Sequence, residues 1–308
     1  MICQTTIARP TAISGIGLHT GQRINMTLRP ADAGVGIVFH RQMGDRKVSI
    51  EATSANVVDT RLATVIANGD ARVSTVEHLL AALAAYGVDN LHIDIDGPEV
   101  PIMDGSSAPF VSVIEEAGLT RHSTSRKILA IRKPVTVIDG EKRVSIIPSR
   151  FFRITFDIAF QHPCIALQKR SVKVTPSAFR KDLAPARTFG FLKDVEMLKA
   201  AGLARGGSLE NAIVVDDEKI LNPEGLRFQD EFVRHKILDA IGDLSLIGYP
   251  ILGHVRAFKA GHEVNHLLVE RILDTPDSWQ LLEFSEDDVK AALQMAPAFA
   301  TDLAFSKA

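Results

Sequence analysis

The sequence predicts an α+β protein with two similar domains, each a β-sheet layered with helices, whose helical faces pack together around a site at the domain seam. A length of 308 residues favours two domains of ordinary size. Strand-like and helix-like segments are segregated, and few βαβ units are present, which argues against a doubly wound parallel sheet. Each half also places a histidine, His78 or His235, in an apolar helix that runs into a strand. This similarity is typical of an internal repeat whose two copies have diverged.

The first third of the chain is predicted to form strands separated by turns. Residues 5–13, 23–28 and 34–40 read as strands, and a glycine-containing turn spans residues 15–21. The segment Leu-His-Ile-Asp-Ile-Asp at residues 91–96 alternates with a period of two and predicts another strand. We therefore expect a sheet in the N-terminal half.

Two helices are predicted beside this sheet. The first covers residues 75–85, because leucines recur at helical spacing and Ser74-Thr75-Val76-Glu77 has the S-x-x-E form of a capping box. Gly87 is expected to end it. A second, shorter helix covers residues 108–117 and closes the first domain.

The polar stretch at residues 120–127 is predicted to link the domains, because it has no apolar residue that would anchor it to a core. We place the N-terminal domain at residues 1–124 and the C-terminal domain at residues 125–308. The second half repeats the strand and helix pattern in a longer form, with strands predicted near residues 128–138, 143–147, 153–160 and 251–259.

Composition and charge exclude several classes of protein. The formal net charge is −2, so no global positive field favours nucleic-acid binding. The N-terminus lacks the continuous apolar core of a secretory signal, and no stretch approaches the roughly 18 apolar residues of a membrane span. Cys3 and Cys164 are the only cysteines and do not form a C-x-x-C pair, so we expect packing cysteines in a reduced, cytoplasmic protein.

The segment at residues 230–244 carries the strongest chemical pattern. His235, Asp239 and Asp243 follow one another at four-residue steps, which places them on one face of a helix. Apolar residues such as Phe232 and Leu238 indicate that much of this helix is packed. The alternative is an exposed polar stripe on a solvated helix face.

Glu77 and His78 on the other predicted helix favour a metal site. Hydrolytic zinc sites use three protein ligands and leave one position open, and a nearby carboxylate acts as base. Here the ligands would be His78, His235 and Asp239, with Glu77 as the base, turned about 100° from His78 around the helix axis. The alternative role for Glu77 is only that of the third residue in the capping box.

His262 lies after the last predicted strand, in a loop from which it can enter a cleft. A carboxylate near an imidazole favours the protonated form, so Asp243 beside His262 would make it a general acid. The alternative is a surface histidine.

Five segments of the sequence together resemble one family, the UDP-3-O-acyl-N-acetylglucosamine deacetylases, which are zinc amidases of lipid A biosynthesis. The matching segments are Gly17-Leu18-His19-Thr20-Gly21, Ser74-Thr75-Val76-Glu77-His78-Leu79, Pro98-Glu99-Val100-Pro101-Ile102-Met103-Asp104-Gly105-Ser106, Ala186-Arg187-Thr188-Phe189-Gly190-Phe191 and the segment from Phe232 to Leu244. These segments span nearly the whole chain in the expected order, and together they are specific.

The resemblance implies a role for each matching residue. His78, His235 and Asp239 look like the ligands of one Zn²⁺ per chain, for which Fe²⁺ is the alternative. Glu77 resembles the general base and His262 the general acid, with Asp243 beside it. The remaining family roles fall on Thr188 and Lys236 for stabilising the oxyanion, on Phe160 for stacking against uracil, and on Leu18, Phe189 and Gly207 for contacting the substrate.

The reaction implied is hydrolysis of the 2-acetamido group of UDP-3-O-acyl-N-acetylglucosamine, which releases acetate in the committed step of lipid A biosynthesis. We expect a monomer with at most transient contact with the inner leaflet, because the substrate is amphiphilic. Two other functions stay open: a sugar-nucleotide binding protein with structural zinc, and an amidase for another acylated amino sugar. For residues 98–106, a calcium loop is an alternative to a rigid proline-rich turn.

Overall fold

The structure is a computed structural model that describes residues 2–284, and it confirms the α+β class. Within these residues a five-stranded sheet forms in the N-terminal half in the order β2-β3-β9-β4-β5. The central strand β9 pairs antiparallel with β3 and parallel with β4. The strands are β2 (Thr11–Ile16), β3 (Arg23–Pro30), β9 (Leu91–Ile95), β4 (Ile37–Met43) and β5 (Arg46–Glu51).

Two helices accompany this sheet. Helix α1 (Glu77–Tyr86) is buried on nearly all sides, which explains why its apolar residues do not form a single stripe. Gly87 ends it in the left-handed conformation (φ 72°), as predicted. Helix α2 (Ala108–Ala117) has the predicted bounds and packs against α1 and β2.

A larger sheet forms in the C-terminal half and contains, within the described residues, seven strands around β18. Strand β18 pairs antiparallel with β13 and parallel with β14 and β11. The strands are β11 (Lys127–Ile131), β12 (Val135–Asp139), β13 (Lys142–Ile147), β14 (Phe152–Ala159), β15 (Leu167–Lys173), β18 (Ile251–Phe258) and β19 (Trp279–Glu283).

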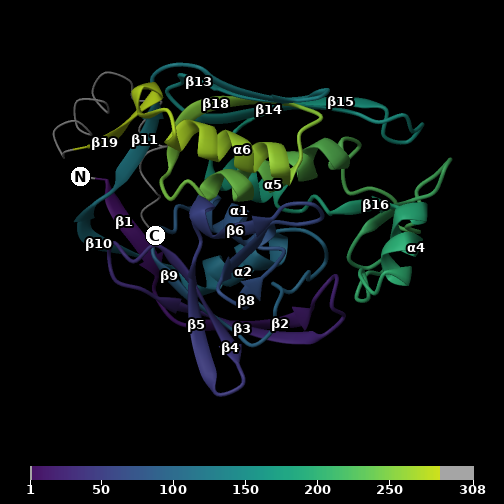
Figure 1. Ribbon diagram of the computed structural model, residues 1–308, viewed down its shortest axis with the longest axis horizontal. Coiled ribbons are helices and arrows are strands. Elements are labelled where there is room, and N and C mark those ends of the chain that lie inside the picture. The colour runs from purple at the N-terminus through teal and green to yellow at the C-terminus, as the bar shows by residue number, and fades with distance from the viewer. Residues whose placement is uncertain (1, 285–308) are drawn as a thin grey trace.

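Helices α5 (Glu231–Ser245) and α6 (His262–Leu273) cover one face of the larger sheet, and α1 packs directly against α5. Figure 1 shows the resulting order of layers, with the larger sheet, α5 and α6, then α1 and α2, and finally the five-stranded sheet. The two helical layers therefore face each other, as the sequence predicted. The boundary between residues 124 and 125 stays a prediction.

The remaining elements are short and lie at the edges of these layers. Strand β16 pairs parallel with β17, and together with α4 it projects from one end of the molecule (Figure 1). These elements are β1 (Cys3–Ile7), η1 (Ser54–Asn56), β6 (Val57–Asp59), β7 (Val65–Asn68), β8 (Ala71–Val73), β10 (Leu119–Ser125), α3 (Pro176–Ala178), η2 (Phe179–Leu183), β16 (Phe189–Phe191), α4 (Leu192–Ala200), β17 (Ile213–Val215) and η3 (Pro276–Ser278). No helix among residues 2–284 is long and apolar enough to cross a bilayer.

Two local predictions were wrong, and the linker stays a prediction. The segment predicted to link the domains is strand β10, which pairs with β1 through backbone hydrogen bonds that need no apolar side chains. The predicted strand at residues 5–13 is two strands interrupted before Thr11. The capping box is not formed, because Thr75 adopts φ 58° and the helix begins after Val76 without a side-chain cap.

Candidate active site

The site lies where α1 crosses α5 at very short range. Gly242 of α5 makes this approach possible, because a Cβ built on it would lie 2.1 Å from the backbone oxygen of Glu77. The crossing brings the rings of His78 and His235 together, with centroids 4.9 Å apart. The sequence prediction that these histidines from distant segments meet is therefore confirmed.

His78, His235 and Asp239 form a group whose ligand atoms all lie within 4.8 Å of one another. Asp239 Oδ1 is 3.5 Å from His78 Nε2 and 3.2 Å from His235 Nε2. All three residues are at most 3% exposed, so the alternative of an exposed polar stripe is wrong. The arrangement is that of a two-histidine, one-carboxylate metal site.

The hydrogen bonds of this group fit a metal ion. His235 Nδ1 lies 3.0 Å from the carbonyl oxygen of Ala186, which can only accept, so Nδ1 carries the proton and Nε2 keeps its lone pair. Asp239 Oδ1 is buried and has no hydrogen-bond partner among residues 2–284. A buried carboxylate oxygen without a donor is costly, and a cation between it and the imidazoles would satisfy it.

Electrostatics hold these groups in their ligating forms. Burial lowers the pKa of His235 to about 3, so its imidazole is neutral. Burial alone would raise the pKa of Asp239, but His235, in the protonated form that it takes at low pH, and the ammonium of Lys236 lower it well below the usual value. Lys236 donates to Asp239 Oδ2 at 2.8 Å, and despite the opposing effect of burial this carboxylate raises the lysine pKa.

Glu77 is 3% exposed and stands beside the group at the first position of α1. Its Oε2 accepts from the backbone N–H of Thr64 at 3.1 Å and makes no helix cap. The alternative that Glu77 serves only in a capping box is therefore wrong. Burial raises the pKa of this carboxyl above its usual value. A carboxylate with a raised pKa is suited to accept a proton near neutral pH.

His262 approaches the site from α6. It is the first residue of that helix and not a loop residue, which corrects the sequence prediction. Its Nδ1 lies 3.0 Å from Asp243 Oδ2, and its side chain is 11% exposed, so the surface alternative is also wrong. Burial alone would lower the pKa of His262, but the charge and hydrogen bond of Asp243 raise it to about 9.

These side chains surround a small cavity of about 100 Å³. Glu77 and His262 contribute to its wall together with the candidate metal ligands, so a proton acceptor and a proton donor share one cavity. The other lining residues are Leu18, His19, Leu62, Ala63, Thr75, His78, Ile102, Thr188, Phe189, His235, Lys236 and Asp239.

Comparisons with known proteins identify the family. The sequence profile described as UDP-3-O-acyl N-acetylglycosamine deacetylase matches residues 4–274. A UDP-3-O-acyl-N-acetylglucosamine deacetylase from Syntrophotalea carbinolica is 64% identical over 295 residues and covers 96% of each chain. The chain belongs to this deacetylase family.

Two further relatives with the same description agree. The protein from Geobacter sp. strain M21 is 59% identical, covering 92% of this chain and 93% of its own. The protein from Myxococcus xanthus is 53% identical, covering 91% and 89%. Membership of the deacetylase family confirms the prediction of a hydrolase that acts on an amide.

The residues predicted to contact substrate form two neighbouring pairs. The rings of Phe189 and Phe160 meet edge to face, with centroids 5.9 Å apart, and the ring of Phe189 lies 6.4 Å from that of His235. A Cβ added to Gly207 would lie 3.5 Å from Leu18, so these two predicted residues are also neighbours. Phe160 and Gly207 lie outside the cavity wall, and Thr188, Phe189 and Leu18 lie within it.

The proline-rich segment after β9 serves as a structural support in this deacetylase. Glu99 is fully buried, and its carboxylate accepts from the backbone N–H groups of His19 and Thr20, at 2.9 and 3.1 Å, and from the hydroxyl of Thr75, at 3.2 Å. Asp104 pairs with Arg227 at 2.9 Å. Both carboxylates are engaged by protein donors, which favours the rigid turn over a calcium loop.

Sequence reasoning missed three residues that shape the site. Thr64 donates from its hydroxyl to Asp243 at 2.6 Å, and Asn265 donates to the same carboxylate at 2.9 Å. Both ring nitrogens of His19 are buried in the cavity wall without a hydrogen-bond partner in the described part of the chain. The three-residue spacing from His262 to Asn265 was the available signal for Asn265, whereas Thr64 had none.

Proposed function

We propose that this chain hydrolyses the 2-acetamido group of UDP-3-O-acyl-N-acetylglucosamine and releases acetate, the committed step of lipid A biosynthesis. Relatives that match nearly its full length are named UDP-3-O-acyl-N-acetylglucosamine deacetylases. The observation that carries the proposal is one buried cavity lined by two histidines and an aspartate at ligating distances, together with Glu77 and His262.

His78, His235 and Asp239 would hold one Zn²⁺, for which Fe²⁺ is the alternative because nitrogen and oxygen ligands suit both ions. A bound zinc ion supplies Lewis acidity, which polarises the amide carbonyl and makes water nucleophilic at neutral pH. The hydrogen bond from His235 Nδ1 to Ala186 fixes the tautomer and the ring orientation that ligation needs.

Glu77 acts as the general base. Its carboxylate is held by the N–H of Thr64 at 3.1 Å, within the cavity that contains the candidate metal ligands. It accepts the proton that water loses when it attacks the amide carbon. The raised pKa increases its strength as a base.

His262 acts as the general acid. Its Nδ1 donates to Asp243, so Nε2 is the nitrogen available to give a proton to the leaving amine. An amine without that proton is a very poor leaving group. A pKa of about 9 keeps the imidazole protonated at neutral pH. Asp243 holds it in place and is itself bound by Thr64 and Asn265.

Thr188 and Lys236 stabilise the charge that develops on the carbonyl oxygen. Both line the cavity, and they offer a hydroxyl donor and an ammonium group from different segments. Donors that are already fixed before reaction stabilise a developing oxyanion without reorganising.

The substrate binds along the two walls beside the cavity. Phe160 offers its ring to the uracil base, and Phe189 lies between Phe160 and the metal ligands. Leu18 and Gly207 line the entry of the acyl chain, which then passes the partly buried Leu192, Val195 and Leu198 of α4. We place this site at the seam of domains 1–124 and 125–308, in a cytoplasmic monomer that touches the inner leaflet at most transiently.

Release of acetate tests this proposal. Purified protein is incubated with UDP-3-O-acyl-N-acetylglucosamine before chelation, after chelation, and after stoichiometric zinc is added back. We expect activity that disappears and returns with zinc, and that falls sharply when either the acyl chain or the UDP group is removed. Folded, zinc-loaded protein without acetate release would contradict the proposal and favour a binding protein with structural zinc.

A further inference from the structure

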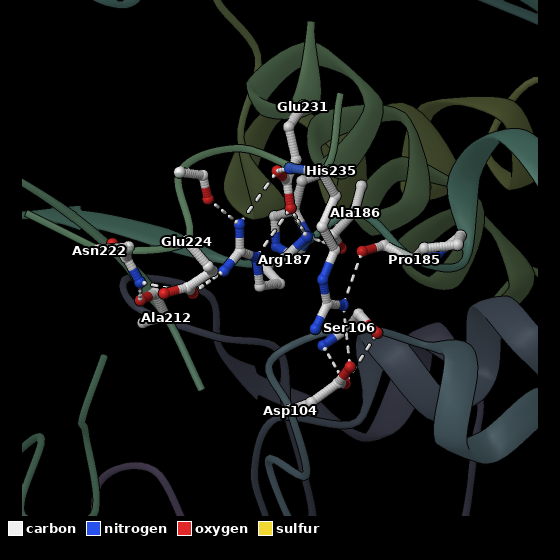
Figure 2. A network of polar contacts seen from close by, with 12 residues as sticks. Asp104, Ser106, Pro185, Ala186, Arg187, Ala212, Asn222, Glu224, Glu231 and His235 are labelled. Carbon is white, nitrogen blue, oxygen red and sulfur yellow. Dashed lines mark hydrogen bonds and ion pairs between the residues drawn. The ribbon is translucent and has the colours of Figure 1, made fainter. Parts of the chain in front are cut away.

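The peptide unit between Ala186 and Arg187 is held from both sides. Its carbonyl oxygen accepts from His235 Nδ1 at 3.0 Å, and its N–H donates to Glu231 Oε1 at 3.0 Å. Glu231 precedes His235 by four residues on α5, so both side chains emerge from the same helix face. One turn of helix, two hydrogen bonds and one peptide unit thus form a closed ring behind the imidazole of His235 (Figure 2).

The side chain of Arg187 reinforces this ring. Its Nε donates to Glu231 Oε1 at 2.9 Å and its Nη2 to Oε2 at 3.3 Å, so the guanidinium binds the carboxylate in a two-point arrangement. The two residues are 1% and 0% exposed. This pair is therefore a fully buried ion pair whose geometry depends on the planar fork of arginine.

Arg187 also fixes the loop that precedes α5. Its Nη1 donates to Glu224 at 2.5 Å and its Nη2 to the carbonyl of Gly225 at 2.7 Å. The backbone N–H of Arg227 completes the coordination of Glu231, at 2.5 Å from Oε2. Figure 2 shows the carboxylates of Glu224 and Glu231 on either side of the guanidinium of Arg187.

The same segment fixes Thr188, the next residue in the chain. Its N–H donates to the carbonyl of Gly105 at 2.8 Å, and its own carbonyl accepts from the N–H of Ile213 at 2.8 Å. Gly105 has φ +82°, and a Cβ there would lie 2.0 Å from the backbone oxygen of Asn211. Thr188 therefore has both backbone groups bound in a packed position, directly after the residue whose guanidinium binds Glu231.

We propose that Arg187 and Glu231 are positioning residues, which orient the imidazole of His235 toward the metal and aim the hydroxyl of Thr188 into the cavity. Neither residue touches substrate or metal in this assignment. The inference rests on the proposed function for the identity of the metal, and the roles of the two residues follow from the ring of contacts. A purely structural ion pair would need neither the shared peptide unit nor the four-residue spacing to His235.

The experiment compares three changes in the full chain. Arg187→Lys keeps the charge and loses the fork. Glu231→Gln keeps the shape and weakens the pairing. The double change Arg187→Met with Glu231→Leu removes both charges, which often leaves stability nearly unchanged or improved. Arg126→Lys is the matched control, because Arg126 donates to Asp89 at 2.7 Å in a partly buried pair that does not line the cavity.

Each variant is measured for Zn²⁺ affinity by competition with a chromophoric chelator, for the visible spectrum of its Co²⁺ form, and for thermal stability. We expect Arg187→Lys and the double variant to bind Zn²⁺ about 10–100-fold more weakly, the usual cost of disturbing an outer hydrogen-bond partner of a ligand. Their Co²⁺ spectra should change, and kcat should fall more than KM. Arg126→Lys should leave Zn²⁺ affinity and spectrum unchanged.

The double variant separates positioning from stability. If the double variant is as stable as the unchanged protein but binds Zn²⁺ more weakly, Arg187 and Glu231 orient His235. If Zn²⁺ affinity simply follows thermal stability across the series, or if Arg187→Lys has the unchanged protein's affinity and spectrum, the inference is overturned. If the unchanged protein binds Zn²⁺ but releases no acetate, the proposed function is contradicted. The measurements of Zn²⁺ affinity and Co²⁺ spectrum still test the positioning roles of Arg187 and Glu231.

Discussion

The two helices that meet at the site are supported by buried carboxylates of different kinds. Behind α1, Glu99 is satisfied by backbone N–H groups and hydroxyls, and within residues 2–284 it forms no ion pair. Behind α5, Glu231 is bound by the guanidinium of Arg187. Neutral donors fix a carboxylate through several weak contacts, whereas Glu231 has one charged partner in addition to its backbone donors, and the loss of that partner leaves an uncompensated charge.

This difference also separates the chemistry that each helix contributes. Helix α1 supplies His78 and Glu77 from adjacent positions, so one helix end delivers both a ligand and a proton acceptor. Helix α5 supplies two ligands and Asp243 at four-residue steps. We therefore expect substitutions on α1 to separate metal binding from turnover more cleanly than substitutions on α5.

The largest expected effect is on turnover. Glu77→Ala should lower kcat by about 10²–10⁴-fold, the usual contribution of a general base, while zinc content stays near one ion per chain. His78→Ala, its neighbour on α1, is the matched control and should lose zinc. Metal analysis of both purified variants, together with kcat, checks this; loss of zinc from Glu77→Ala would show that the assigned roles are wrong.

Gly242→Ala should have the next largest effect. The added Cβ would lie 2.1 Å from the backbone oxygen of Glu77, so α1 and α5 must move apart. We expect a loss of about 1–3 kcal/mol in the free energy of unfolding, measured with urea, and a loss of activity in the folded fraction. The control is Gly261→Ala, where an added Cβ meets nothing within 4 Å. Equal stability of the two variants would contradict the close crossing.

Glu99→Gln tests the neutral support behind α1. The amide keeps one acceptor and the size of the side chain, but its NH₂ group faces donors that previously met a carboxylate oxygen. We expect a loss of about 1–2 kcal/mol in unfolding free energy. KM should rise more than kcat falls, because the freed segment carries Leu18 and His19 of the cavity wall. A drop in zinc affinity with KM unchanged would contradict this, because it would show that Glu99 supports the metal ligands and not the cavity wall.

The pH dependence should separate α1 from the α5 and α6 pair. Activity should rise as Glu77 loses its proton, at a pH above the usual range of a carboxylic acid, because burial raises its pKa. Activity should fall as His262 loses its proton near pH 9, because Asp243 raises its pKa. Asp243→Asn should move the alkaline limb downward by at least about one pH unit, or 1.4 kcal/mol, and the acidic limb downward by less, because Asp243 is the main cause that raises the pKa of His262 and a minor cause for Glu77. If the acidic limb of the kcat/KM profile moved and the alkaline limb did not, the roles assigned to Glu77 and His262 would have to be exchanged.

The sequence predicted the elements whose side chains alternate or repeat clearly. The bounds of α2 and the alternation of β9 both follow from apolar periodicity. Strand β10 escaped prediction because its residues are mostly exposed and polar, and its pairing with β1 depends on backbone groups. Periodicity carries no information about such a strand.

The site was predictable where ligand chemistry fixes residue types. His78, His235 and Asp239 were found from spacing and came together as expected. The supports were not found, because a single Thr64, Glu99 or Arg187 has no periodic partner in the sequence. Their partners lie 13, 80 and 44 residues away, so only the fold reveals them. The false capping box has the same cause, since the φ of Thr75 is set by tertiary contacts.

The close contact between α1 and α5 also limits how this site can change over time. A small molecule that reached the metal ligands would press on residues of both helical layers, among which the three ligands and Glu77 are at most 3% exposed. A substitution that displaced such a molecule from the metal ligands would also loosen the core. Resistance gained in that way would therefore reduce the stability of the protein. Helix α4 has no buried residue and leaves Met197 64% exposed. Tolerated resistance changes should therefore gather around α4, and compounds confined to the buried cavity should lose potency more slowly.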